Sequence, residues 1–249
     1  MPPLWRASQE LDLANLTGPE RADYVQGMFT RIAPRYDLMN RLMTAGQDTR
    51  WRREVIQRTS LPPGGRLLDL GAGTGDLADE ALSQYPGCRL VAADFTLQMM
   101  RFGKRRSNST VDWSAADALH LPFPTSTFDA LVSGFLLRNV TNIAQVLSEH
   151  YRVLKPGGRM VALDTTRPPR SVLSPLIDAH MKVVIPAIGQ LVTGEREAYT
   201  YLPDSTASFL SAEQLAARLA VAGFREVGFR RLMFGTVAIH WGKKEEDLK

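Results

Sequence analysis

The stretch LLDLGAGTGDLA, residues 67–78, decides the fold of this chain. A short apolar run ends in glycines at alternate positions, Gly71, Gly73 and Gly75, and a helical pattern follows directly. Glycine at these positions lets the backbone turn tightly and lets a ligand approach it, where a side chain would block the way. The stretch therefore predicts a strand, a ligand-binding turn and a helix, in that order.

The same order of strand and helix repeats along the middle of the chain. Strands that alternate with helices predict right-handed crossovers and a parallel sheet covered on both faces. Such sheets bind ligands beyond the carboxyl ends of their strands. The expected strands are residues 66–71, 88–94, 111–117, 128–134 and 158–164, and the expected helices are residues 76–84, 96–106 and 141–154.

Two further apolar runs, residues 225–233 and 235–241, are close enough in sequence to form a hairpin. They follow an expected helix over residues 212–222, which stops at Gly223. We therefore expect an α/β, Rossmann-like fold: a mostly parallel seven-stranded sheet flanked by helices, with a C-terminal antiparallel hairpin.

We expect residues 1–249 to form a single domain. Two segments break the alternation, and neither has apolar residues enough for a core of its own, so both are expected to lie over the ligand-binding edge. The expected parts are a helical cover (residues 1–60), a cofactor-binding core (61–166), a substrate-covering helical insertion (167–205) and a C-terminal helix with its hairpin (206–249).

The composition is that of an ordinary globular protein, with 44% hydrophobic and 22% charged residues. A net charge of +4 is too small to indicate a nucleic-acid partner. Basic residues cluster at Arg50, Arg52 and Arg53 and at residues 104–106. Solvated helix ends are the simpler interpretation of both clusters, and contact with an anionic membrane surface is the alternative.

The single cysteine, Cys88, excludes an intramolecular disulfide and a cysteine-based metal cage, and the four histidines are dispersed, so no metal site is expected. Neither a secretory signal nor a spanning apolar stretch is visible. These features predict a cytoplasmic protein and leave peripheral contact with the inner face of the membrane, and a homodimer, open.

The glycine-rich turn differs from a dinucleotide fingerprint. That fingerprint requires Gly or Ala where this chain has Asp76, which disfavours a pyrophosphate. Asp69, just inside the end of the first strand, favours a cationic ligand group instead. Asp94, at the end of the second strand, is placed to accept both hydroxyls of a ribose, although a helix N-cap would also explain it.

Residues after the third strand suit an adenine. The carboxylate of Asp117 can accept from the exocyclic amine, Ala118 offers a backbone N–H, and Phe95 is placed to pack on the ring face. Together these residues describe a nucleoside whose remaining group is not a diphosphate. S-adenosylmethionine fits this description, with its ribose at Asp94 and its amino-acid portion along the glycine turn.

Several stretches of the chain resemble the UbiE/MenG family of quinone-biosynthesis C-methyltransferases, within the class I methyltransferases. They are MFTRIAPRYDLMNRLMTAG (residues 28–46), LPFPTSTFD, LLRNVTN, YRVLKPGGRM, YTYLPDS and AGF, in the family's order. The pair RYDLMN and LRNV is the specific part, since RVLKPGG is common to many class I methyltransferases. The resemblance implies methyl transfer from S-adenosylmethionine to a ring carbon of a polyprenylated quinol, such as demethylmenaquinol.

Position by position, the resemblance implies cofactor contacts at Thr74, Asp94, Asp117 and Ala118 together with the glycine turn. Tyr36, in RYDLMN, is expected beside the cofactor unless it serves ordinary packing.

This chain departs from the family pattern at three places. It has Gly134 where the family usually has serine, Asp48 and Thr49 in place of a His-Arg pair, and Leu136 in place of a glycine.

The arginine of LRNV is the best candidate for chemistry on the acceptor. Arg138 follows an apolar strand, where a cation could lower the pKa of a quinol hydroxyl or hold its oxyanion. Asn139 would orient the loop, Tyr201 would line the cavity, and His180 would act as a base through water. A salt bridge from Arg138 to Glu149 or a helix-capping role, and packing for Tyr201 and His180, stay open as alternatives.

Three other functions share parts of this pattern. A class I methyltransferase could act on another lipid or a small phenolic acceptor, a nicotinamide oxidoreductase would bind NAD tightly, and a non-catalytic assembly protein would bind the cofactor without turnover.

Overall fold

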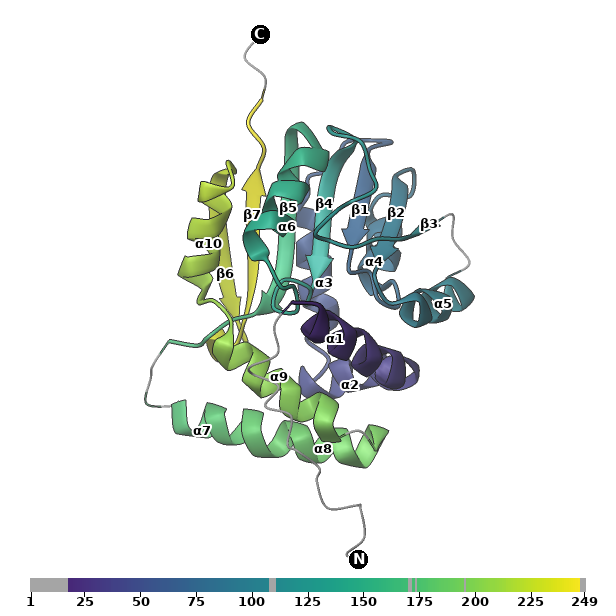
Figure 1. Cartoon of the computed structure of the whole chain (residues 1–249). Helices are drawn as coiled ribbons and strands as arrows, with labels where there is room; N and C mark the ends of the chain where they lie inside the picture. Colours follow the sequence, from purple (N-terminus) through teal and green to yellow (C-terminus); the bar gives the residue numbers. More distant parts are fainter. Residues whose placement is uncertain (1–17, 108–110, 170–171, 173, 195, 247–249) are drawn as a thin grey trace, which may run out of the picture.

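The computed structural model describes residues 18–107, 111–169, 172, 174–194 and 196–246. Its seven strands are β1 (Arg66–Leu70), β2 (Arg89–Asp94), β3 (Val111–Ala115), β4 (Phe128–Gly134), β5 (Leu154–Thr165), β6 (Arg225–Leu232) and β7 (Val237–Lys243). They form one sheet of order β3-β2-β1-β4-β5-β7-β6 (Figure 1). β1 to β5 pair in parallel, whereas β7 runs antiparallel to both β5 and β6. The predicted fold class is confirmed.

β5 begins earlier than the sequence suggested. The glycines of KPGG indicated a start at residue 158, but β5 starts at Leu154, which pairs with Phe128. The register then shifts between Phe128 and Ala130. Gly157 takes a positive φ of 77°, so the glycine forms an irregularity within the strand instead of a turn before it.

Alternate residues of the strands meet two different helix layers. Leu68 and Leu131 pack in a core with α6 (Ile143–Val153) and α10 (Ala212–Val221). Leu67 and Val132 pack in a second core with α3 (Asp48–Arg58) and α4 (Asp76–Gln84). This alternation is what a two-sided parallel sheet requires, because successive side chains point to opposite faces. The helix α5 (Leu97–Arg106) connects β2 to β3.

The remaining helices lie beyond the carboxyl ends of β1 and β4 (Figure 1). They are α1 (Gly18–Ile32), α2 (Tyr36–Met43), α7 (Ser174–Ala179), a π-helical turn (His180–Val184), α8 (Ile185–Thr193) and α9 (Arg196–Ser208). A third apolar cluster joins Met28 and Met39 of the N-terminal helices to Ile185, Tyr199 and Tyr201 of the later ones. The two segments that broke the alternation therefore share one core. In the described part of the chain, no helix is long and apolar enough to cross a bilayer.

Candidate functional site

The glycine-rich turn joins β1 to α4 at the carboxyl edge of the sheet. Gly71 and Gly73 have φ values of 70° and 57°, a region that L side chains rarely adopt. A Cβ atom at Gly71 would lie 3.0 Å from Cδ1 of Leu136, so the position has no room for a side chain. Gly75, with φ 89°, begins α4 and would place a Cβ 3.0 Å from the ring of Trp113. Gly71 and Gly73 thus face the ligand side, and Gly75 serves packing.

One cavity opens at this edge, between the sheet and α1. The residues predicted to bind the cofactor that line it are Tyr36, Gly71, Gly73, Asp94, Phe95, Asp117, Ala118 and Gly134, and Asn139, predicted to orient the loop, lines it as well. Val25, Gln26 and Phe29 of α1 close the side away from the sheet. Residues from four separate strand ends therefore meet in one hollow, as expected where the carboxyl ends of parallel strands converge.

Asp94 is tied to the backbone on both sides of the cavity. Its Oδ2 accepts the N–H of Gly73 at 2.8 Å, and its Oδ1 accepts the N–H of Thr96 at 2.6 Å. Burial raises the pKa of this carboxyl, and the two backbone N–H groups oppose the rise. Asp94 thus fixes the glycine turn and the start of α5 together.

The residues predicted to meet an adenine differ in exposure. Asp117 is exposed, and its Oδ1 accepts the N–H of Leu119 at 2.9 Å. Ala118 is buried, and Phe95 presents an exposed ring, 45% accessible, at the rim of the cavity. An aromatic ring at such a rim can cover one face of a flat ligand.

Asp69 lines a second, smaller cavity on the other side of the glycine turn, together with Asn40, Arg52, Thr74 and Asp76. Asp69 is completely buried, and among the described residues neither of its carboxyl oxygens has a hydrogen-bond partner. Burial, with repulsion from Asp94, raises its pKa to about 8, and the nearby backbone N–H of Ala78 opposes the rise. A buried carboxyl without partners is costly, and a ligand cation would supply the missing one.

Arg138 forms a buried ion pair at the end of β4. Its Nη1 lies 3.0 Å from Oδ1 of Asp164, and the two side chains are 8% and 1% exposed. Its backbone N–H also donates to Asp164, at 3.3 Å. The alternative pairing with Glu149 is wrong, because Glu149 binds Arg152 at 2.7 Å. The Nε of Arg138 is buried and has no hydrogen-bond partner in the described residues.

A third, apolar cavity lies between α1, α2 and α9. Its lining comprises Met28, Phe29, Ile32, Tyr36, Met39, Asn40, Met43, Arg138, Tyr199 and Tyr201. Tyr36 lines all three cavities and so stands at their junction. Burial raises the pKa of the Tyr36 phenol, opposed by a hydrogen bond with Asn40, and keeps the phenol protonated. The structure thus places this apolar cavity beside the one that contains Asp94 and Asp117, with Tyr36 between them.

Two of the other predicted catalytic residues are joined directly. The hydroxyl of Tyr201 donates to Oδ1 of Asn139 at 3.2 Å, and Nδ2 of Asn139 donates to the carbonyl of Phe135 at 2.9 Å. His180 lies in the π-helical turn between α7 and α8 and lines none of these three cavities. The structure therefore brings Arg138, Asn139 and Tyr201 together without His180.

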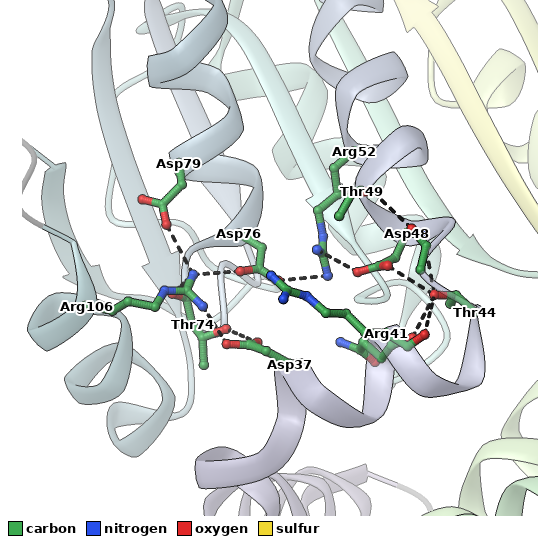
Figure 2. A network of polar contacts seen from close by, with 12 residues as sticks. Asp37, Arg41, Thr44, Asp48, Thr49, Arg52, Thr74, Asp76, Asp79 and Arg106 are labelled. Atoms are coloured by element: carbon green, nitrogen blue, oxygen red, sulfur yellow. Dashed lines mark hydrogen bonds and ion pairs between the residues drawn. The ribbon is translucent and has the colours of Figure 1, made fainter.

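Sequence reasoning missed a polar network beside the glycine turn, shown in Figure 2. Arg106 pairs with Asp37, Asp76 and Asp79, and Arg52 pairs with Asp48 and Asp76. Interpreting Arg52 as a solvated helix end was wrong, since it is only 9% exposed. Arg106 does end α5 and is partly exposed, but it is also held by three carboxylates. Arg52 and Asp48 are four residues apart on one helix and could have been paired from the sequence, whereas Arg106 and Asp37 are 69 residues apart and carry no local signal.

The comparisons with known proteins agree with this geometry. The model of the ubiE/COQ5 methyltransferase family matches residues 18–244. The "Ubiquinone/menaquinone biosynthesis C-methyltransferase UbiE" of Desulfotalea psychrophila is 45% identical over 221 residues, which cover 88% of this chain and 90% of the relative. The "Demethylmenaquinone methyltransferase" of Thermus thermophilus is 42% identical over 220 residues, which cover 87% of this chain and all of the relative (100%).

Solved structures support the fold. A SAM-dependent methyltransferase from Thermotoga maritima superposes with a TM-score of 0.63 at 19% identity, covering 88% of this chain and 99% of that one. Phosphoethanolamine N-methyltransferase 2 of Haemonchus contortus, solved with S-adenosylhomocysteine, gives 0.64 at 15% identity, covering 91% of this chain and 60% of that one. The family model and the two close relatives together show that the chain belongs to the ubiE/COQ5 methyltransferase family.

Proposed function

We propose that this S-adenosylmethionine-dependent methyltransferase methylates a ring carbon of a polyprenylated quinol, demethylmenaquinol, and so forms menaquinol. The names of the relatives motivate the acceptor. The observation that carries the proposal is the pair of adjoining cavities: a first one with the carboxylates of Asp94 and Asp117 in its lining, and an apolar one, lined mainly by methionine and aromatic side chains, that ends on Arg138. A nucleoside methyl donor and a hydrophobic ring acceptor need two such cavities that meet at one point.

The cavity that contains Asp94 and Asp117 suits the cofactor, which supplies an electrophilic methyl group on a sulfonium when it is bound. In this proposal Asp94 accepts the ribose hydroxyls, while Asp117 and Ala118 bind the adenine edge and Phe95 covers its face. Gly71, Gly73, Thr74 and Gly134 border the amino-acid portion. The α-ammonium group fits beside the carboxyl of Asp69, because it would be the positively charged hydrogen-bond partner that this carboxyl does not have in the protein.

The apolar cavity suits the quinol ring. Loss of a phenolic proton makes the neighbouring ring carbon nucleophilic; that carbon then forms a bond to the methyl group, and the sulfur keeps the electron pair. Loss of the ring hydrogen and return of a proton to the oxygen restore the quinol, so one proton is released overall. The enzyme's largest contribution is to hold donor and acceptor carbon within about 3–3.5 Å, in line.

Arg138 is placed to stabilise the phenolate. Arg138 is among the residues that line the apolar cavity, where a buried cation would interact far more strongly with an oxyanion than it would in water. Asp164 holds one edge of the guanidinium, and Nε has no hydrogen-bond partner in the described residues. Asn139 and Tyr201 orient the loop that carries Arg138, through the hydrogen bond between their side chains.

The prenyl tail gives a reason for contact with a membrane. The helices α7 and α8 and the π-helical turn between them, at the far end of the cover (Figure 1), expose large apolar side chains: Leu176 is 69%, Val183 65% and Leu191 87% accessible. We propose that this face touches the inner surface of the membrane, from the cytoplasm, while the tail is withdrawn. Flotation with liposomes tests it: the protein should float, and Val183→Glu with Leu191→Glu should abolish flotation. A homodimer that buries this face would instead show a concentration-dependent mass in sedimentation.

The decisive experiment for the activity uses purified enzyme, methyl-labelled S-adenosylmethionine and three reduced acceptors. Demethylmenaquinol should take up label, whereas a demethyl-benzoquinol with the same tail and a small phenol should not. Cells lacking the protein should accumulate the demethyl-quinone, as measured by mass spectrometry. An unchanged quinone pool, or labelling of the small phenol alone, would refute the proposed acceptor.

A further inference from the structure

Helix α2 is tied to the glycine turn by a single carboxylate. Oδ1 of Asp37 accepts the hydroxyl proton of Thr74 at 2.6 Å, and Oδ2 pairs with Nη1 of Arg106 at 2.5 Å (Figure 2). Arg106 also donates to the backbone carbonyl of Thr74, at 2.9 Å. One arginine therefore binds the turn that faces the cofactor and the helix that faces the apolar cavity.

The other contacts of Arg106 fix it in place. Its Nη2 pairs with Asp76 at 2.6 Å and with Asp79 at 3.2 Å, both on the first turn of α4. Asp76 in turn binds Arg52 of α3 at 2.8 Å. The guanidinium of Arg106 thus has defined partners on three elements, and its position follows that of α4 and the turn.

Asp37 is adjacent to the residue at which the cavities meet. Tyr36 and Asp37 form the first turn of α2, a helix of eight residues without a side-chain N-cap. The same helix supplies Met39, Asn40 and Met43 to the apolar cavity. A shift or rotation of α2 would therefore move Tyr36 and one wall of the apolar cavity at once, relative to the glycine turn.

We propose that Asp37 and Arg106 are positioning residues of the methyl transfer: they clamp α2 to the glycine turn and so hold Tyr36 and the acceptor cavity in register with the cofactor. The part that concerns the acceptor rests on the proposed function. The clamp binds neither the donor nor the acceptor, so its loss should change the geometry between them. A displacement of about 1 Å can lower a rate about 10²-fold, so loss of such a clamp can lower kcat strongly.

The same contacts should matter little for global stability. The side chains of Arg106 and Asp37 are 39% and 30% exposed, and ion pairs near the surface contribute little to folding. A fall in turnover without a fall in stability would therefore identify positioning and exclude unfolding.

The test compares Asp37→Asn and Arg106→Gln with Arg105→Ala, which removes the neighbouring exposed arginine of α5 and serves as the matched control. We expect kcat with demethylmenaquinol to fall at least about tenfold in the first two variants, with the Kd for S-adenosylhomocysteine within about threefold of the parent. Hydrogen exchange of the α2 amides should accelerate in both, with unchanged exchange in β1 and β4. Arg105→Ala should match the parent in all three measurements.

Three results would overturn the inference: parent kcat in Asp37→Asn and Arg106→Gln, a loss of cofactor affinity as large as the loss of kcat, or unaltered exchange in α2. Exchange needs no acceptor, so it tests the clamp even if demethylmenaquinol proves to be the wrong substrate. A parent enzyme without turnover but with accelerated α2 exchange in the variants would refute the acceptor and keep the clamp.

Discussion

Asparagine at position 69 should make the free protein more stable and the cofactor complex weaker. Asp69 is fully buried with unpaired oxygens, and burial raises its pKa from 3.8 to about 8. Between these two values the folded state binds a proton that the unfolded state does not, so this residue lowers the free energy of unfolding as pH rises. At about 1.4 kcal/mol per pH unit, the cost is roughly 2 kcal/mol at pH 5 and roughly 4 kcal/mol at pH 7, as upper bounds.

Urea unfolding of Asp69→Asn and of the parent, from pH 5 to above pH 8, measures how the free energy of unfolding of each depends on pH. The difference in the free energy of unfolding should grow in favour of the variant by about 1 kcal/mol per pH unit, and level off above pH 8, where the parent carboxyl is ionised in both states. The slope is the critical quantity, because it does not depend on how the amide packs.

Cofactor affinity should respond in the opposite direction. The α-ammonium of S-adenosylhomocysteine stabilises ionised Asp69, so the parent should release a proton on binding at pH 7 and bind more tightly toward pH 8. Calorimetry in buffers of different ionisation enthalpy detects the proton. A stability difference that does not change with pH would show that the fold does not raise the pKa of Asp69. Equal cofactor affinity and equal proton release in Asp69→Asn and the parent would show that Asp69 is not the partner of the ammonium group.

Three further substitutions test the site. Arg138→Gln should keep the Kd for S-adenosylhomocysteine and lower kcat about 10²-fold, since it removes one preorganised donor to the oxyanion; a parallel loss of affinity would contradict that role. Gly71→Ala should weaken cofactor binding, because its φ of 70° strains an L residue by about 1 kcal/mol or more and its Cβ meets Leu136 at 3.0 Å; Leu136→Ala should relieve the contact, and calorimetry on both variants would show whether it does. Tyr201→Phe, which loses the 3.2 Å hydrogen bond to Asn139, should reduce kcat by less than about tenfold in steady-state assays, and a loss as large as that of Arg138→Gln would make the hydroxyl catalytic.

The strands and the glycine turn could be predicted because their signals are local. Apolar runs of strand length, a breaker before each of them and glycines at Gly71 and Gly73 depend on neighbours in sequence alone. The gathering of Asp94 and Asp117 at one edge followed from a general rule about parallel strands. The resemblance of RYDLMN and LRNV supplied the family, which the comparisons confirm.

The partners that charged side chains find far away in the sequence could not be predicted. Arg138 reaches Asp164 across 26 residues, and Arg106 reaches Asp37 across 69, because β4 lies beside β5 and α5 ends beside α2. An ion pair depends on distances of a few ångströms between atoms that sequence leaves undetermined. The same limit explains why Arg106 resembled a solvated helix end and why His180 could not be separated from the residues at the cavity.

The order of apolar runs and glycines was enough to determine the sheet, its crossovers and the edge that binds a ligand, since each depends on short-range periodicity and on the handedness of the chain. The three adjoining cavities, the place of Tyr36 between them and the clamp from Asp37 to Arg106 exist only in the folded molecule. They arise where helices far apart in sequence pack against one another, and packing is decided by the shapes of whole surfaces.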